Sequence, residues 1–169
     1  MPNELILFID LWDAEAVKTI NLFRALPLDG YDFRPDPDAR SLGEMAWHIA
    51  EVDGYGPWSI EQGGFSRESR PPGLERPRAI EELAPAYERV HRDAIERVRK
   101  LTPDDLDRAI PFVNGQPITI RHVLWTFMLL HQIHHRGQLV LLMRNAGGTP
   151  VPMYGWTRET APQRRVKET

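Results

Sequence analysis

The stretch VLWTFMLLHQIHHRGQLVLLM, residues 123–143, decides the fold class of this protein. Within it Leu124, Met128 and His131 recur at steps of four and three residues, the spacing of one face of an α-helix. Apolar residues also fill much of the remaining surface, a pattern typical of a helix that is covered on more than one face. We therefore expect a long helix over residues 119–147 that either lies centrally in an all-α protein or forms a dimer interface.

Three further segments carry helical periodicity, and four helices around one core predict a four-helix bundle. The second helix begins with a capping box, in which Ser41 caps the first turn and Glu44 reaches back. A long crossover rich in arginine and proline, residues 64–77, leads to the third helix and permits a topology other than simple up-down alternation. Asn114-Gly115 predicts a tight turn or small hairpin before the fourth. The expected helices span residues 5–23, 41–62, 78–101 and 119–147.

Length and composition narrow the class of protein. The 169 residues suit one domain, which we place at residues 1–155, followed by a polar tail at 156–169. A net charge of −3 argues against direct binding of nucleic acid. The longest apolar runs are too short for a membrane span or a secretory signal, so we expect a cytoplasmic protein. The absence of cysteine excludes disulfides and thiolate ligands, which leaves histidines and carboxylates as metal ligands.

The fourth helix places two histidines one turn apart. On a regular helix His131 and His135 lie in the centre of the core-facing stripe, His134 lies at its edge, and Arg136 points away. Two imidazoles at positions i and i+4 project in parallel and suit a single metal ion. Buried without a ligand, the same nitrogens would need hydrogen-bond partners.

A third histidine lies in the second helix. His48 shares one helical face with Glu44, Val52 and Tyr55. If the second and fourth helices are neighbours, His48 can join the pair in a three-histidine site with an open coordination position, as in catalytic metal centres. Glu44 is then a candidate to orient His48 or to shuttle a proton.

Other polar residues allow simpler interpretations. His91 lies near an apolar stripe and is either structural or a substitute ligand, and His122 caps the fourth helix or is exposed. Tyr55 can line the mouth of a pocket or simply pack. Arg136 and Gln138 can position a neighbouring element or an anionic ligand, and a surface or dimer role for Arg136 is equally open. We interpret the arginines of the crossover as a solvated loop; they are Arg67, Arg70, Arg76 and Arg78.

Two motifs resemble those of the DinB/YfiT-like superfamily of metalloenzymes. They are Trp47-His48-Ile49-Ala50 and the stretch from His131 to Leu139, in which His-Arg-Gly-Gln is the most specific part. The resemblance covers nearly the whole domain and implies a four-helix bundle with up-down-down-up topology, often dimeric. It also implies a divalent metal, held here by His48, His131 and His135. The sequence does not choose among Zn, Ni, Fe and Mn, because imidazole suits several of them.

The expected function follows from the site and from the resemblance. We expect a metal-dependent enzyme that acts on a small molecule, either a hydrolase or a thiol-dependent S-transferase. The resemblance implies a low-molecular-weight thiol such as bacillithiol or mycothiol as the cofactor of such a transferase. Two alternatives stay open: a non-catalytic, metal-binding stress-response dimer, and a bundle without metal in which the histidines and Glu44 satisfy one another.

Overall fold

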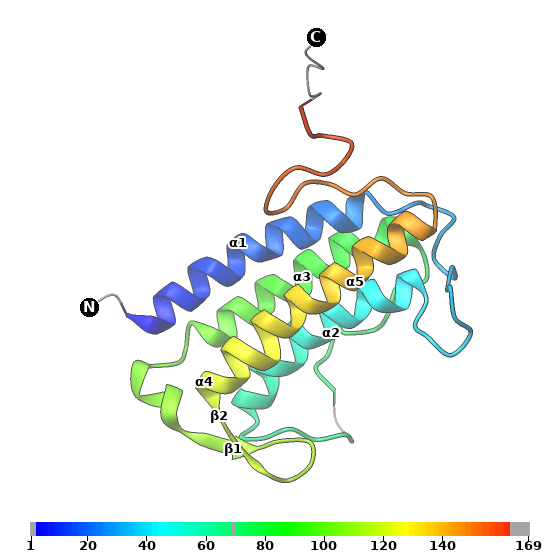
Figure 1. Cartoon of the computed structure of the whole chain (residues 1–169). Coiled ribbons are helices and arrows are strands. Elements are labelled where there is room, and N and C mark those ends of the chain that lie inside the picture. The colour runs from blue at the N-terminus through cyan, green and yellow to red at the C-terminus, as the bar shows by residue number, and fades with distance from the viewer. Residues whose placement is uncertain (1–2, 69, 163–169) are drawn as a thin grey trace.

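The computed structural model describes residues 3–68 and 70–162, and most of the chain is helical (Figure 1). Two short strands, β1 (Ala109–Pro111) and β2 (Pro117–Thr119), form an antiparallel hairpin that pairs Ile110 with Ile118. In chain order the helices are α1 (Glu4–Arg24), α2 (Leu42–Glu61), α3 (Ile80–Val98), the short 3₁₀ helix η1 (Pro103–Asp107), α4 (Ile120–His122), η2 (Val123–Leu130) and α5 (His131–Asn145). The segments α4, η2 and α5 follow one another without a break, which confirms the predicted long fourth helical segment.

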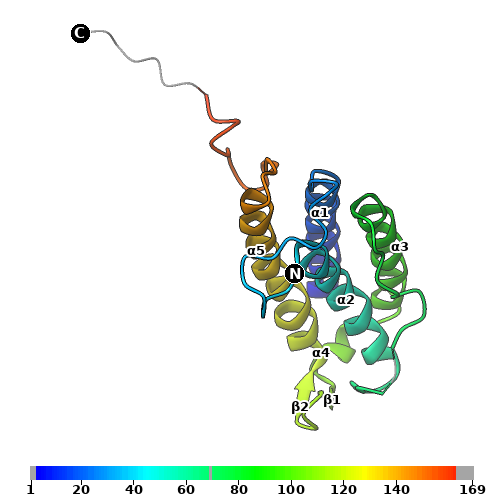
Figure 2. The ribbon, with the colours of Figure 1, turned by 90° about the vertical axis from the view of Figure 1, so that its right-hand side faces the viewer.

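The long helical segments lie side by side (Figures 1 and 2). Helix α2 contacts α3, η2 and α5, and α1 contacts α3 and η2. The second and fourth helical segments are therefore neighbours, as the sequence analysis required for a three-histidine site. Within the described ranges, none of the helices combines the length and the apolar character that crossing a bilayer requires. Of the predicted polar tail, residues 163–169 lie outside the described part of the chain.

The start and the end of α2 follow the sequence signals. The Ser41 hydroxyl accepts a hydrogen bond from the Glu44 backbone N–H, and the Glu44 carboxylate accepts one from the Ser41 N–H, which completes the capping box. Pro57 does not interrupt the helix, which continues to Glu61. Gly63 then adopts φ +79°, a left-handed conformation that glycine takes without strain.

The fourth helical segment departs from the regular helix that we expected. Residues 123–130 form a π-helical stretch, in which each turn holds more residues than an α-helical turn. The regular periodicity counted from Leu124 therefore fails beyond this stretch. The buried side chains of α5 are Gln132, Arg136, Leu139 and Met143, whereas His131 and His135 are only partly buried.

Arg136 is consequently on the buried side of α5, and the prediction that it points away from the core is wrong. Its guanidinium donates to the backbone carbonyl of Glu15 at 2.8 Å and to the Thr19 hydroxyl at 3.1 Å. It also pairs with the Glu15 carboxylate and donates to the Tyr154 hydroxyl. Burial raises the pKa of Glu15, but the hydrogen bonds from Lys18, Tyr154 and Arg136 outweigh it, so the pKa lies below its usual value. Arg136 thus joins α5 to α1 and positions neighbouring elements.

A buried carboxylate connects all four long helical segments. Asp53 of α2 is fully buried and accepts hydrogen bonds from Trp12 of α1 at 3.0 Å and from Tyr87 of α3 at 2.7 Å. His91 Nδ1 lies 3.0 Å from the same carboxylate, and Gln132 of α5 donates to it at 3.3 Å. A buried charge is stable only when it is compensated in this way. Asp53 therefore fixes how the helices are aligned along their lengths.

We predict that Asp53→Ala lowers the free energy of unfolding by about 3–5 kcal/mol, because it leaves several buried donors without an acceptor. Urea denaturation of the purified protein measures this loss. The matched control is Asp93→Ala, which removes an exposed carboxylate from α3 and should change stability by less than about 0.5 kcal/mol. Equal stability of the two variants would contradict the structural role of Asp53.

Candidate metal centre

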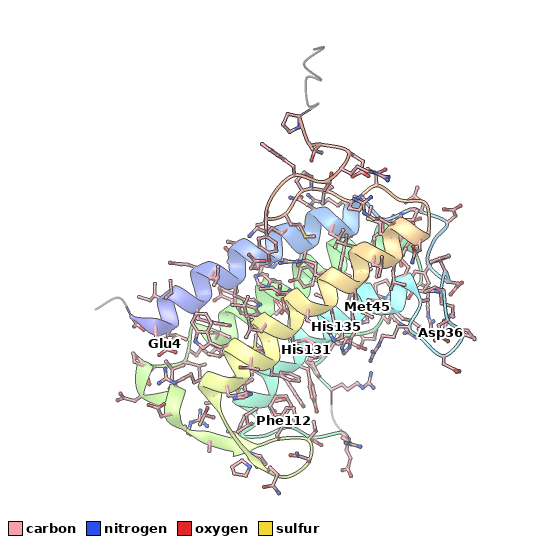
Figure 3. All side chains as sticks on the ribbon, viewed as in Figure 1. Glu4, Asp36, Met45, Phe112, His131 and His135 are labelled. Carbon is pink, nitrogen blue, oxygen red and sulfur yellow. The ribbon has the colours of Figure 1, made fainter. Side chains whose placement is uncertain are left out.

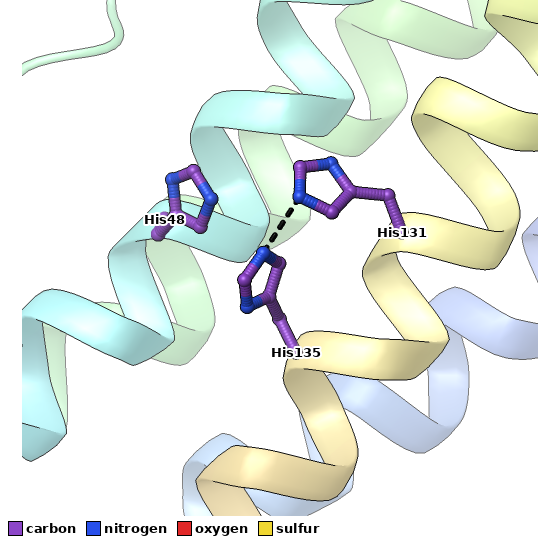
Figure 4. A group of neighbouring side chains, drawn as sticks. All are labelled: His48, His131 and His135. Carbon is purple, nitrogen blue, oxygen red and sulfur yellow. Dashed lines mark hydrogen bonds between the residues drawn. The ribbon is translucent and has the colours of Figure 1, made fainter.

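Three histidines from two helices meet at one point. His48 projects from α2, and His131 and His135 project from successive turns of α5 (Figures 3 and 4). Each offers one ring nitrogen, and these three atoms all lie within 4.8 Å of one another. The imidazole of His48 contacts both others edge-on, with ring centroids 5.6 Å from His131 and 4.6 Å from His135. This grouping is the one that the sequence predicted, although it lies at the edge of the core rather than in its centre.

An oxygen atom lies near Nδ1 of each histidine. His131 Nδ1 lies 3.2 Å from the backbone carbonyl of Phe127, and His135 Nδ1 lies 2.7 Å from the Gln138 side-chain oxygen. His48 Nδ1 lies 3.5 Å from the Glu51 carboxylate. Carbonyl, amide and carboxylate oxygens in this position are typical of histidines that bind metals through Nε2.

The geometry between the two α5 histidines fits a cation. Their Nε2 atoms lie 2.6 Å apart (Figure 4). When each Nδ1 donates its proton to the oxygen beside it, both Nε2 atoms carry lone pairs that face each other. That arrangement is repulsive unless the two nitrogens share a proton or both bind a metal ion, and a ring nitrogen of His48 lies within 4.8 Å of both. The residues present therefore fit a divalent transition metal, for which imidazole is a common ligand.

The electrostatics of the site favour the neutral forms of His131 and His135. Burial lowers the pKa of His135 to about 4, with the neighbouring histidines contributing to this net value and the hydrogen bond with Gln138 opposing it. Burial also lowers the pKa of His131, with His48 adding to the effect. Neutral imidazoles at neutral pH are the form that binds metal.

A cleft of about 410 Å³ opens directly beside His48. Its apolar wall consists of Val52, Tyr55, Leu74, Val113 and Phe127. Its polar lining consists of His48, Glu51, Ser66, Arg67 and Arg70. Apolar clefts of this size with a few polar groups are the usual form of small-molecule sites. The candidate ligand His48 thus borders a space in which a small molecule fits.

The carboxylate that contacts His48 is that of Glu51 and not that of Glu44. Glu44 is held by the capping box and by Arg34 and Arg76, at 3.3 and 3.4 Å. The hydrogen bond from Ser41 lowers the pKa of Glu44, and the arginines add to this against the effect of burial. Glu44 does line a separate open hollow together with His135, so its role in proton transfer stays a prediction. The spacing His48-x-x-Glu51 is the sequence signal that could have identified the closer carboxylate.

The other predicted site residues divide between the cleft and the core. Tyr55 lines the cleft, and its hydroxyl donates to the Ser66 carbonyl. Gln138 supports His135, while Arg136 is buried on the other side of α5. His91, considered as a substitute ligand, is instead bound to Asp53 in the core.

The sequence matches the DinB family over residues 1–166. The chain belongs to the DinB family. Among its relatives is the uncharacterized protein YrdA of Bacillus subtilis (strain 168), which is 26% identical over 153 residues, 90% of this chain and 89% of YrdA. YjoA of the same organism is 28% identical over 138 residues, 80% of this chain and 86% of YjoA.

Solved structures support the family assignment. A DinB-like protein from Bacillus cereus ATCC 10987 superposes with a TM-score of 0.72 at 26% identity, covering 87% of this chain and 95% of that one. The structure of YjoA superposes with a TM-score of 0.71, covering 87% of this chain and 96% of its own, and at 24% identity it supports the fold alone. The predicted family is thus confirmed, and the chain shares its fold with these proteins over most of their length.

We predict that the metal-free protein loses stability as the pH falls from 6.5 toward 4, partly through His135. The folded protein holds His135 neutral down to about pH 4, whereas the unfolded chain takes up a proton near pH 6.5. Between these values the unfolded state binds more protons, so stability rises with pH. Urea midpoints across this range should depend less on pH in His135→Gln than in the wild type. Equal pH dependence in both proteins would contradict the assignment.

Proposed function

We propose that this DinB-family protein is a divalent-metal-dependent enzyme that acts on a small molecule, either as a hydrolase or as an S-transferase that joins a low-molecular-weight thiol of the bacillithiol or mycothiol type to a small electrophile. The observation that carries the proposal is that His48 belongs both to the three-histidine group and to the lining of the cleft. Three protein ligands leave a coordination position open, which separates catalytic centres from closed structural ones. A divalent ion in such a centre supplies Lewis acidity, which lowers the pKa of a thiol or water nucleophile.

The residues of the chain have separate tasks in this proposal. His48, His131 and His135 hold the ion, with Zn, Ni, Fe and Mn all compatible with imidazole ligands. Because the chain has no cysteine, the thiol must come from a small molecule. Glu51 faces both His48 and the cleft, where its carboxylate can accept the proton that the thiol releases. Phe127 and Val113 form part of the apolar wall of the cleft beside His48.

We also propose the finer features that the family resemblance implies. The contacts of α2 with α3 and α5, together with the long crossover between α2 and α3, support a four-helix bundle with up-down-down-up topology. The resemblance also implies a homodimer. Sedimentation equilibrium measures the mass directly.

We predict that the protein, purified without a histidine tag, retains about one divalent ion per chain. His131→Ala and His48→Ala should each lose most of this metal, because two imidazoles bind an ion much more weakly than three. Elemental analysis of the dialysed proteins measures the content. His122→Ala is the matched control, since His122 is exposed and lies outside the group. A double variant of His48 and His131 that still retains the ion would exclude this site.

We predict that the metal-loaded protein accelerates the reaction of bacillithiol or mycothiol with monochlorobimane. In this reaction a carbon–sulfur bond forms, chloride leaves and the thiol proton is released. Glu51→Gln should lower the rate about 10- to 100-fold, as expected for the partner of a metal ligand, whereas Glu44→Gln tests the second carboxylate in the same assay. A metal-loaded protein that is inactive with every thiol would favour hydrolysis or a non-catalytic metal protein instead.

A further inference from the structure

The crossover between α2 and α3 places two arginines on the cleft. Arg67 and Arg70 line the same 410 Å³ space as His48. A second hollow of about 440 Å³ shares Arg70, Glu51 and Leu74 with the first, so the two hollows adjoin. This second hollow adds Arg76, Arg78 and Glu75 to the lining. The crossover arginines, of which Arg67 and Arg70 are exposed as expected of a solvated loop, therefore line two adjoining hollows.

Hydrogen bonds on both sides of these arginines fix the crossover to the rest of the protein. The Tyr55 hydroxyl donates to the Ser66 carbonyl, and the Phe65 N–H donates to the Pro111 carbonyl at 2.8 Å. On the far side, the Trp47 indole N–H donates to the Leu74 carbonyl at 3.3 Å. The fold thus holds the loop over the cleft at both ends of the segment that carries Arg67 and Arg70.

The cleft is lined by more positive than negative side chains. Neither Arg67 nor Arg70 forms an ion pair with any of the residues 3–68 and 70–162, whereas Arg76 pairs with Glu44. The carboxylate in the cleft is Glu51, and it lies beside His48. Over the two joined hollows four guanidinium groups face two carboxylates, those of Glu51 and Glu75. Guanidinium groups beside an apolar wall are suited to bind a planar or tetrahedral oxyanion through paired hydrogen bonds.

We propose that the cleft binds an amphipathic organic anion. Its apolar body lies against Phe127, Val113 and Tyr55, and its anionic group lies at Arg67 and Arg70. This inference rests on the proposed function, because it places the reacting end of the molecule at His48. The ligand class is a small aromatic or branched aliphatic molecule that carries a carboxylate, sulfonate or phosphate.

The test uses three probes that share a phenylbutyl body and carry an anionic, a neutral or a cationic head group: phenylbutanesulfonate, phenylbutanol and phenylbutylamine. A sulfonate is a weak metal ligand, so its binding reports the arginines rather than the ion. Isothermal titration calorimetry at low ionic strength should show the sulfonate binding about tenfold more tightly than the alcohol, the effect of a charge-assisted hydrogen bond in a partly exposed cleft. The amine should bind most weakly.

Variants separate the contribution of the arginines from the contribution of the apolar wall. Arg67→Gln/Arg70→Gln should remove the preference for the sulfonate and leave binding of the alcohol unchanged. Val113→Ser should weaken the sulfonate and the alcohol alike. Arg92→Gln, which removes an exposed arginine of α3 outside the cleft, should change neither affinity. Tighter binding of the amine, or a sulfonate preference that survives in the double variant, would overturn the proposal.

Metal content measured on the same samples distinguishes this inference from the proposed function. If the wild-type protein holds metal but the double variant of Arg67 and Arg70 binds the sulfonate equally well, the anion site alone is refuted. A protein without metal that still prefers the sulfonate through Arg67 and Arg70 refutes the metal-dependent function, while the anion site stands.

Discussion

The carboxylate of Asp53 is the constraint on which the arrangement of the helices depends. It is fully buried and takes hydrogen bonds from side chains of α1, α3 and α5. A helix that slid along its neighbours by one turn would leave this charge and its donors unpaired, at a cost comparable to much of the stability of a small domain. Gln132, one of the donors, directly follows His131 and lies within one helical turn of His135. The alignment fixed at Asp53 is therefore the alignment that brings His48 to the other two histidines.

The three-histidine group shows how the same alignment prepares a site for chemistry. Each imidazole has an oxygen near Nδ1, and those oxygens come from Phe127, Gln138 and Glu51. Phe127 and Gln138 belong to the same helical segment as His131 and His135, so the position of these two oxygens follows from the sequence nearby. Glu51 likewise lies one turn after His48 on α2. What the tertiary structure adds is the approach of the two helices, which turns three separately oriented rings into one group.

The cleft combines elements that are distant in the chain. Val52 and Tyr55 come from α2, Phe127 comes from η2, and Val113 comes from the hairpin loop. Close contact between α2 and η2 is possible because Gly56 has no side chain: a Cβ at this position would lie 2.7 Å from the sulfur of Met128. The crossover then closes one side and brings arginines to the space beside His48. His48 of the three-histidine group and the crossover residues Arg67 and Arg70 thus line one cleft.

The sequence by itself determined the helices, the capping box of α2, the hairpin before the fourth helical segment, the family, and the three histidines that come together. These follow from local propensities and from spacing, which depend on residues near one another in the chain. It did not determine the burial of Arg136, the contact of Glu51 with His48, or the position of the crossover arginines on the cleft. The π-helical stretch shifts the helical phase after residue 130, and a phase counted from regular geometry cannot include it. Arg136 and the crossover arginines are placed by long-range contacts with α1, α2 and the hairpin, and only tertiary packing decides which distant groups meet a given side chain.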